Sequence, residues 1–213
     1  RSDYAGHAHV ANPGCYPTAA SLALAPLLAG GLVEPTGLIV DAASGISGRG
    51  RGLSAPSLYS EANENVAAYG LLTHRHTAEM ELALGRLSPT GSASVLFTPH
   101  LVPMTRGILA TCYARPTAEA ASLGTDGLLA HYRDFYASEP FVAVLDQPPA
   151  TKATAGSNSV QVTVRYDGRT NTVLAITAED NLVKGASGQA LQNANLLLGL
   201  PETLGLPTVG LVP

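Results

Sequence analysis

Cys15 is the residue whose type and position best suit covalent chemistry. It follows a turn signal at residues 12–14 and precedes a run of Ala and Leu at helical spacing, residues 18–28, with Thr18 as the expected cap. A thiol at a helix N-terminus is close to unpaired backbone N–H groups and to the positive end of the helix dipole, which lower its pKa and can bind an oxyanion. We therefore expect Cys15 to act as a nucleophile, although small cysteines are also common as inert core residues.

A histidine pair could supply the acid/base chemistry that a thiol nucleophile needs. In an extended stretch, His74 and His76 point to the same side, and a histidine near a thiolate can act as general acid and base. A structural role for either ring is the alternative. Such a pair can also chelate zinc, with His100, Glu79 or a cysteine as a further ligand, but no repeated ligand spacing supports this and we expect no metal site.

The Gly-rich loop at residues 44–51 is a candidate anion site. Its backbone N–H groups could surround an anion, and Arg51 could add a fixed positive charge. The loop has neither the phosphate-loop spacing nor the dinucleotide fingerprint, so an ordinary mobile loop is the alternative. Arg75 and Arg106 are the other cations close to candidate groups, and each could instead lie on the surface.

The elements that must position these residues are predicted from the periodicity of apolar side chains. Helices are predicted at residues 18–28, 77–87, 124–137 and 183–198, and strands at 38–42, 92–97, 108–114, 160–166 and 172–177. Residues 167–169 predict a hairpin between the last two strands. Several strands close together in the sequence favour an antiparallel sheet, within one large domain or two small ones.

Composition excludes several classes of function. Hydrophobic residues make up 46% of the chain and charged residues 13%, which is typical of a globular protein. The net charge of -4 and the scattered Lys and Arg argue against nucleic acid as a partner, and no apolar run is long enough to cross a membrane. Two cysteines, with Cys112 in an apolar strand pattern, and no secretion signal favour a reduced, cytoplasmic setting.

Several motifs, in order, resemble the N-acetyl-gamma-glutamyl-phosphate reductases of arginine biosynthesis. They lie at residues 12–18, 44–51, 74–79, 97–109, 180–190 and 199–203, so the resemblance covers nearly the whole chain. It implies an α/β fold of the α+β type: a catalytic domain like that of glyceraldehyde-3-phosphate dehydrogenase, with a mixed, mainly antiparallel sheet covered by helices.

The resemblance also implies a reaction. Cys15 would attack the acyl phosphate of N-acetyl-L-glutamyl 5-phosphate and expel phosphate, and NADPH would reduce the resulting thioester to N-acetyl-L-glutamate 5-semialdehyde. One of His74 and His76 would be the acid/base, without a basis for choosing between them. The residues expected to bind substrate are Arg75, Arg106, Ser47 and Arg51, and those expected near the nicotinamide are Asn181 and Lys184.

The family's domain organisation includes a nucleotide-binding domain in addition to the catalytic domain. Residues 1–180 would form the catalytic, substrate-binding and dimerisation domain, and residues 181–213 a C-terminal helix and tail that belong with a nucleotide-binding Rossmann domain. That domain precedes the cysteine motif in the family and is not in this sequence. We therefore expect the chain alone to bind NADP poorly, to be inactive, and to expose apolar area on residues 183–198.

The sequence also allows functions other than that of a reductase. Besides the reductase, assembled as a homodimer or homotetramer, the chain could be a non-redox thiol acyltransferase or hydrolase, or a substrate-binding or assembly fragment without activity of its own.

The family commonly has Pro where this chain has Ala78 and a small residue where it has Arg49. Neither change replaces a group with an expected chemical role.

Overall fold

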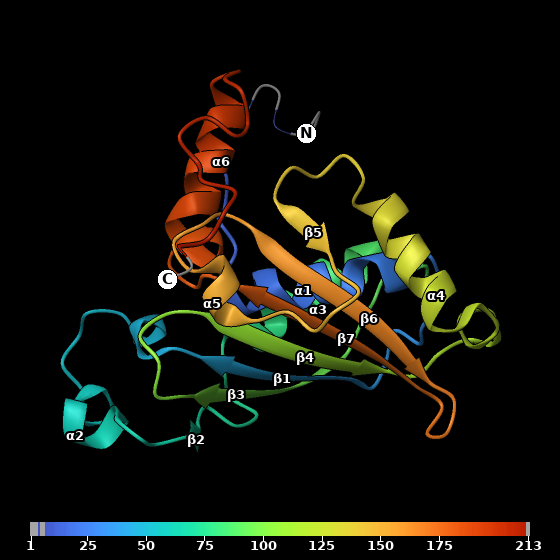
Figure 1. Ribbon diagram of the computed structural model, residues 1–213, viewed down its shortest axis with the longest axis horizontal. Coiled ribbons are helices and arrows are strands. Elements are labelled where there is room, and N and C mark those ends of the chain that lie inside the picture. The colour runs from blue at the N-terminus through green and yellow to red at the C-terminus, as the bar shows by residue number, and fades with distance from the viewer. Residues whose placement is uncertain (1–3, 5–6, 212–213) are drawn as a thin grey trace.

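The computed structural model describes residue 4 and residues 7–211, and these contain a seven-stranded sheet in the order β2-β3-β1-β4-β7-β6-β5 (Figure 1). The strands are β1 (Leu38–Ser44), β2 (Ala67–Ala68), β3 (Val95–Leu101), β4 (Ile108–Ala114), β5 (Val142–Val144), β6 (Val160–Asp167) and β7 (Thr172–Glu179). β1 runs parallel to β3, and β5 parallel to β6. The other neighbours are antiparallel, so the expected mixed, mainly antiparallel sheet is confirmed.

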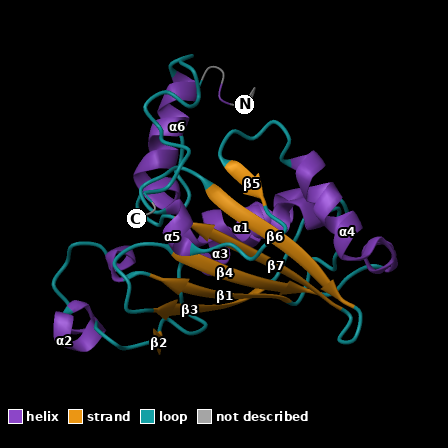
Figure 2. Cartoon of the chain, in the orientation of Figure 1, coloured by secondary structure: helices purple, strands orange, loops and turns teal. Residues whose placement is uncertain are grey.

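The helices are α1 (Cys15–Ala29), α2 (Tyr59–Ala62), α3 (His76–Leu87), α4 (Ala118–Phe135), α5 (Thr151–Thr154) and α6 (Gly188–Leu197), with 3-10 turns η2 (Ile46–Arg49) and η3 (Ala55–Ser57) and a π-helical turn η4 (Val183–Ser187). Of these, α1, α3 and α4 cover one face of the sheet (Figure 2). α1 packs against β4 and β7 and is flanked by α3 and α4. Beneath α1, Val40, Cys112 and Ala175 are aligned across neighbouring strands and fully buried. Burial raises the pKa of the Cys112 thiol, as suits an inert core residue.

The observed starts of α1 and α4 differ from the predicted ones. α1 begins at Cys15, and its N-cap is Gly14, which has no side chain to cap with. The capping role predicted for Thr18 is wrong: Thr18 lies inside the helix, and its hydroxyl donates back to the Gly14 carbonyl. α4 consists of two helical segments that meet at Gly124, whose φ of 62° and ψ of -168° are not helical. The first segment begins at Ala118 with Thr117 as its cap and was not predicted, whereas the second follows Gly124, where the predicted helix begins.

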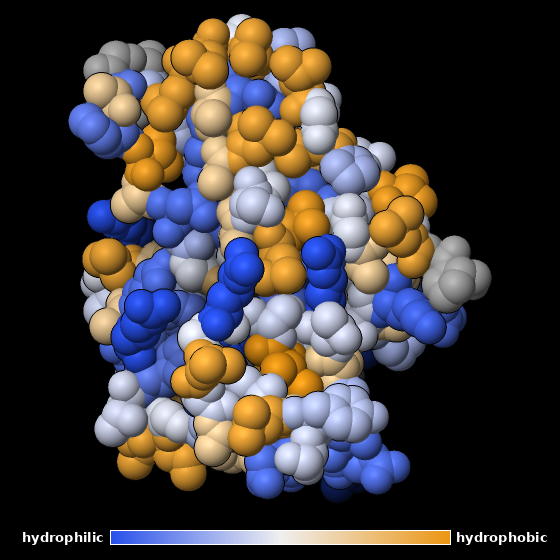
Figure 3. Space-filling view, turned by 90° about the vertical axis from the view of Figure 1, so that its left-hand side faces the viewer, coloured by the Kyte–Doolittle hydropathy of each residue, from blue (hydrophilic) through white to orange (hydrophobic). Residues whose placement is uncertain are grey.

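The segment after β7 packs back on the rest of the chain. Its predicted single helix is a π-helical turn followed by α6, and the tail returns beside residues 155–159, where Leu211 N–H donates to the Ala155 carbonyl. Leu191, Leu198 and Leu204 remain 43%, 73% and 51% exposed. Hydrophobic side chains accordingly gather toward the top of the face in Figure 3, over α6 and the tail.

Among the described residues, no helix is both long and apolar enough to span a membrane.

A proline inside α1 explains how α4 is attached to it. Pro26 has no N–H, so the Leu22 carbonyl loses its helical partner. The Tyr136 hydroxyl donates to that carbonyl at 2.7 Å, and the Tyr132 hydroxyl donates to the next one, of Ala23, at 2.5 Å. Two tyrosines of one helical turn therefore satisfy the backbone where the proline disturbs it.

Tyr136→Phe should lower the free energy of unfolding by about 1–3 kcal/mol, because it leaves the half-buried Leu22 carbonyl without a partner. In a Pro26→Ala background the restored N–H takes that carbonyl, and the same change should cost clearly less. Urea unfolding of the parent, of each single variant and of the double variant measures the coupling energy between the two positions. Tyr166→Phe, whose hydroxyl bonds to Asn171 in an exposed hairpin, is the control and should be within about 0.5 kcal/mol of the parent. Equal losses in both backgrounds would contradict this account.

Candidate active site

A pocket of about 210 Å³ surrounds the first residue of α1. Its lining residues are Cys15, Tyr16, Gly48, Arg49, Tyr69, His74, Arg75 and His76. The structure thus brings together the predicted nucleophile, both predicted acid/base candidates and Arg75. They come from the starts of two adjacent helices, with η2 and the residue after β2 closing the pocket from the other side.

Close backbone contacts fix the start of α1 in this pocket. A side-chain Cβ on Gly14 would lie 2.4 Å from Nε2 of His76, so the imidazole packs directly on the glycine backbone. The Gly14 N–H donates to a carboxylate oxygen of Glu79 at 2.7 Å. From the opposite side, a Cβ on Gly185 would lie 2.7 Å from the Cys15 Cβ. Glycine at both positions therefore allows α3 and η4 to contact the turn that carries Cys15.

The Cys15 thiol is less acidic than its place at a helix start suggested. Burial, followed by the charge of Glu179, raises its pKa to about 11, while backbone N–H groups and Arg75 act in the opposite direction. The predicted lowering is therefore wrong in its net sign: the helix terminus contributes as expected, but desolvation is larger. At neutral pH the thiol is mainly protonated, so it would need a base to act as a nucleophile.

The two histidines differ in their surroundings. His76 is 9% exposed, and its Nδ1 has no hydrogen-bond partner in the described structure. Burial and then the neighbouring His74 and Arg75 charges lower its pKa to about 4, so the ring is neutral at pH 7. His74 is half-buried, burial also lowers its pKa, and its Nδ1 accepts the His76 backbone N–H at 3.1 Å. His76 thus has a free nitrogen, whereas one nitrogen of His74 is engaged.

Two tyrosines and Arg49 belong to the pocket but were not among the predicted site residues. The buried Tyr16 and the half-buried Tyr69 share a hydrogen bond of 2.9 Å between their hydroxyl groups. The Arg49 guanidinium lies 5.6 Å from the centre of the Tyr69 ring. Adjacency to Cys15 was a signal for Tyr16, but Tyr69 lies in a stretch with no clear pattern, and Arg49 had been set aside as a departure from the family.

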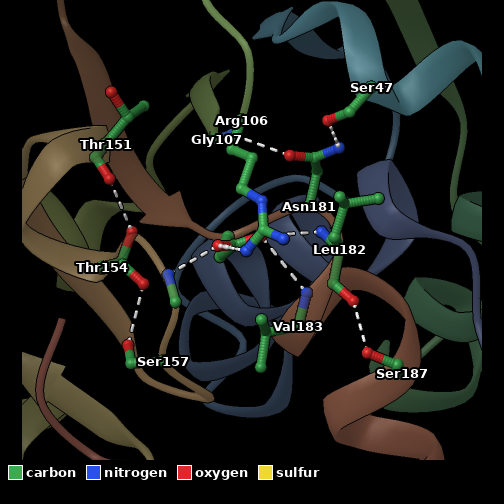
Figure 4. A network of polar contacts seen from close by, with 12 residues as sticks. Ser47, Arg106, Gly107, Thr151, Thr154, Ser157, Asn181, Leu182, Val183 and Ser187 are labelled. Carbon is green, nitrogen blue, oxygen red and sulfur yellow. Dashed lines mark hydrogen bonds and ion pairs between the residues drawn. The ribbon is translucent and has the colours of Figure 1, made fainter. Parts of the chain in front are cut away.

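Ser47, Arg106 and Asn181 form a separate polar network (Figure 4). The Asn181 side chain accepts the Gly107 N–H at 2.7 Å and donates to the Ser47 hydroxyl at 3.0 Å. Arg106 makes an ion pair with the buried Asp180 at 3.4 Å. These residues join the end of β7 to two loops and do not line the Cys15 pocket. Arg51 is exposed and also lies outside the lining.

Asp180 also organises the turn that touches Cys15. One of its carboxylate oxygens accepts the N–H groups of Leu182 and Val183, at 2.8 and 3.2 Å, and the other accepts the Gly156 N–H at 2.7 Å. Figure 4 shows these contacts around the start of η4. The network therefore fixes where η4 begins and, through it, the position of Gly185.

Glu179 is a buried carboxyl that the sequence did not single out. It is fully buried behind Cys15, with one oxygen 3.0 Å from the place of a Cβ on Gly185. Neither oxygen has a hydrogen-bond partner in the described structure, and burial raises its pKa well above the ordinary value. In the sequence it lies in an alternating strand pattern, which gives no indication of this position.

The two residues predicted to lie near the cofactor are both buried and hydrogen-bonded within the chain. Asn181 is 2% exposed and uses its amide in the bonds to Gly107 and Ser47. Lys184 is 8% exposed, and its ammonium donates to Gln192 at 2.8 Å; burial lowers its pKa. Their place near the nicotinamide stays a prediction. Among the described residues, no group of three His, Cys, Asp or Glu is arranged to bind a metal ion.

The fold is that of known semialdehyde dehydrogenases. The family described as Semialdehyde dehydrogenase, dimerisation domain, matches residues 15–181. Aspartate semialdehyde dehydrogenase II from Vibrio cholerae superposes with a TM-score of 0.68 at 18% identity, covering 89% of this chain and 62% of that one. A probable aspartate-semialdehyde dehydrogenase from Pseudomonas aeruginosa gives 0.69 at 19% identity, covering 92% and 65%. The expected glyceraldehyde-3-phosphate-dehydrogenase-like fold is confirmed.

Relatives with much higher identity share one name, N-acetyl-gamma-glutamyl-phosphate reductase. The protein from Desulforudis audaxviator is 54% identical, covering 96% of this chain and 58% of its own length. That from Bradyrhizobium sp. is 53% identical, covering 95% and 61%, and that from Citrifermentans bemidjiense is 50% identical, covering 100% and 61%. This chain thus spans about three fifths of the relatives' length. The chain belongs to the semialdehyde dehydrogenase family and is similar, within it, to the N-acetyl-gamma-glutamyl-phosphate reductases.

Proposed function

We propose that this chain supplies the catalytic and substrate-binding part of an NADPH-dependent reductase that converts N-acetyl-L-glutamyl 5-phosphate into N-acetyl-L-glutamate 5-semialdehyde. The observation that carries the proposal is the pocket in which the Cys15 thiol lies beside a neutral histidine and two guanidinium groups. The name shared by the relatives supplies the substrate. The part of their length that this chain does not span would supply most of the cofactor site.

His76 is the proposed base for the first step. Its ring packs on Gly14, directly before the nucleophile, and a neutral imidazole can take the thiol proton as sulfur attacks the acyl carbon. A carbon–sulfur bond forms, the bond from the acyl carbon to the phosphate oxygen breaks, and phosphate leaves. The N–H groups of Cys15 and Tyr16, at the start of α1, have no helical partner and are placed to hold the oxyanion between these events.

The second step needs a hydride donor. NADPH, when bound, supplies that hydride to the thioester carbon. We propose that Asn181 and Lys184 act indirectly, because their side chains are engaged inside the chain: Asn181 ties the η2 loop to β7, and Lys184 supports α6 through Gln192. His76, which has then received the thiol proton, can return it as the thiolate of Cys15 is released.

We also propose that the chain assembles as a homodimer or homotetramer. α1, α3 and α4 occupy one face of the sheet, and on the opposite face Ile39 and Leu96 are 37% and 49% exposed. The matching family is described as a dimerisation domain. A second copy on this face would cover the exposed apolar side chains.

Cys15→Ser should abolish acylation by N-acetyl-L-glutamyl 5-phosphate, which in the parent chain adds one acyl group at Cys15 and releases one equivalent of phosphate without any cofactor. Cys112→Ala, which changes the buried thiol, should leave acylation nearly intact. Intact mass and phosphate assays measure both. Repeated phosphate release without NADPH would indicate a thiol hydrolase instead, and no acylation of either chain would leave only a binding fragment. In protein of the relatives' full length, loss of NADPH absorbance should follow acylation.

His76→Asn should slow the release of phosphate in this first step by about 10²–10⁴-fold, the usual contribution of a general base. His74→Asn should cost less, because the ring of His74 supports the His76 backbone without contacting Gly14. Rapid-quench measurement of phosphate release at pH 7 distinguishes the two variants. A larger loss for His74→Asn would assign the base to that ring.

Glu179→Gln should make Cys15 more acidic, because a carboxylate behind the thiol disfavours the thiolate. In the parent chain, alkylation by iodoacetamide should increase with pH toward a midpoint at about pH 11; in the variant the midpoint should be lower. Short alkylation pulses across the alkaline range provide the measurement. Glu119→Gln, at an exposed position of α4, is the matched control. An unchanged or higher midpoint in the Glu179 variant would contradict the assigned cause.

A further inference from the structure

Arg49 gives the Cys15 pocket a positive charge at a place where relatives were expected to have a small residue. It is the last residue of η2, and its side chain lines the pocket together with Cys15 and Arg75. The eight lining residues include these two guanidinium groups and no carboxylate. Because the histidines are neutral at pH 7, the pocket is cationic toward whatever enters it.

Two phenol rings fix Arg49 relative to the nucleophile. The guanidinium lies over the Tyr69 ring at 5.6 Å, within the range of a cation–π contact. The Tyr69 hydroxyl bonds to that of Tyr16, the residue that follows Cys15, and the Tyr69 backbone N–H donates to Pro99 in β3. Arg49 therefore belongs to a connected set that begins at the first turn of α1, although it comes from an exposed loop.

The nearby carboxyl groups do not neutralise Arg49. Glu79 accepts the Gly14 N–H from the α3 side, and Glu179 is fully buried behind Cys15. Neither lines the pocket, and no ion pair is found for Arg49 among the described residues. Its guanidinium has a planar fork of donors that suits phosphate oxygens.

We propose that Arg49 binds the phosphoryl group of the acyl phosphate and holds it as it leaves. This rests on the proposed function. In such a substrate the phosphoryl group is attached to the carbonyl that Cys15 attacks, whereas the carboxylate lies several carbon atoms away. An arginine in the same 210 Å³ pocket as the thiol therefore meets the phosphoryl group first. As the carbon–oxygen bond breaks, negative charge grows on the leaving oxygen, and the guanidinium stabilises it.

Protection of Cys15 by inorganic phosphate tests this assignment on the chain itself. Phosphate should slow alkylation by iodoacetamide in the parent, and Arg49→Ala should raise the phosphate concentration for half-protection about tenfold or more, with Arg49→Lys between them. Arg86→Ala removes one exposed positive charge at the far end of α3 and should have no effect. An equal rise in the half-protecting phosphate concentration for Arg49→Ala and Arg86→Ala would show that phosphate responds to the overall positive charge of the surface. That result would overturn the proposal.

Two further arms separate the remaining outcomes. If Arg51→Ala shifts protection and Arg49→Ala does not, the anion lies on the outer part of the loop and the assignment is wrong. If N-acetyl-L-glutamate protects through Arg49 and phosphate does not, Arg49 binds the carboxylate end instead. Broadening of the phosphorus-31 resonance of phosphate reports binding without Cys15. It should be lost in Arg49→Ala, even if the thiol proves unreactive and the proposed function fails.

Discussion

Close packing of two other chain segments against the first turn of α1 is the constraint on which the site depends. Gly14 and Gly185 have no Cβ, and this lets the His76 ring and the η4 turn approach to distances that any other residue would prevent. A thiol packed in this way loses much of its contact with water, so the same packing that orients Cys15 also makes it a weak acid. Orientation and acidity are therefore opposed here.

The network at the end of β7 maintains this packing from a distance. Asp180 fixes the start of η4 through backbone N–H groups, while Asn181 connects the same point to the η2 loop. The η2 loop carries Gly48 and Arg49 into the pocket. Asn181, predicted to lie near the nicotinamide, thus connects the turn that packs against Cys15 to the loop that lines the pocket.

The features predicted correctly from the sequence are those encoded locally. A proline and glycine turn before an Ala-rich run located Cys15 at a helix start, and apolar alternation gave β4 its observed bounds. The sign of the Cys15 pKa shift could not be predicted in this way, since it depends on burial by segments distant in sequence and on Glu179 from β7. Arg49 was missed for a related reason: its role depends on Tyr69, which no periodic pattern locates.

The buried carboxyl of Glu179 also determines how the fold responds to alkali. Its pKa is raised well above that of an exposed glutamate, so the folded chain retains a proton that the unfolded chain releases at lower pH. The stability that this group contributes is fully present below the unfolded pKa and is lost as pH rises through the folded one. The surroundings of the nucleophile thus favour an acidic medium, the reverse of the usual acid-labile carboxylate in an ion pair.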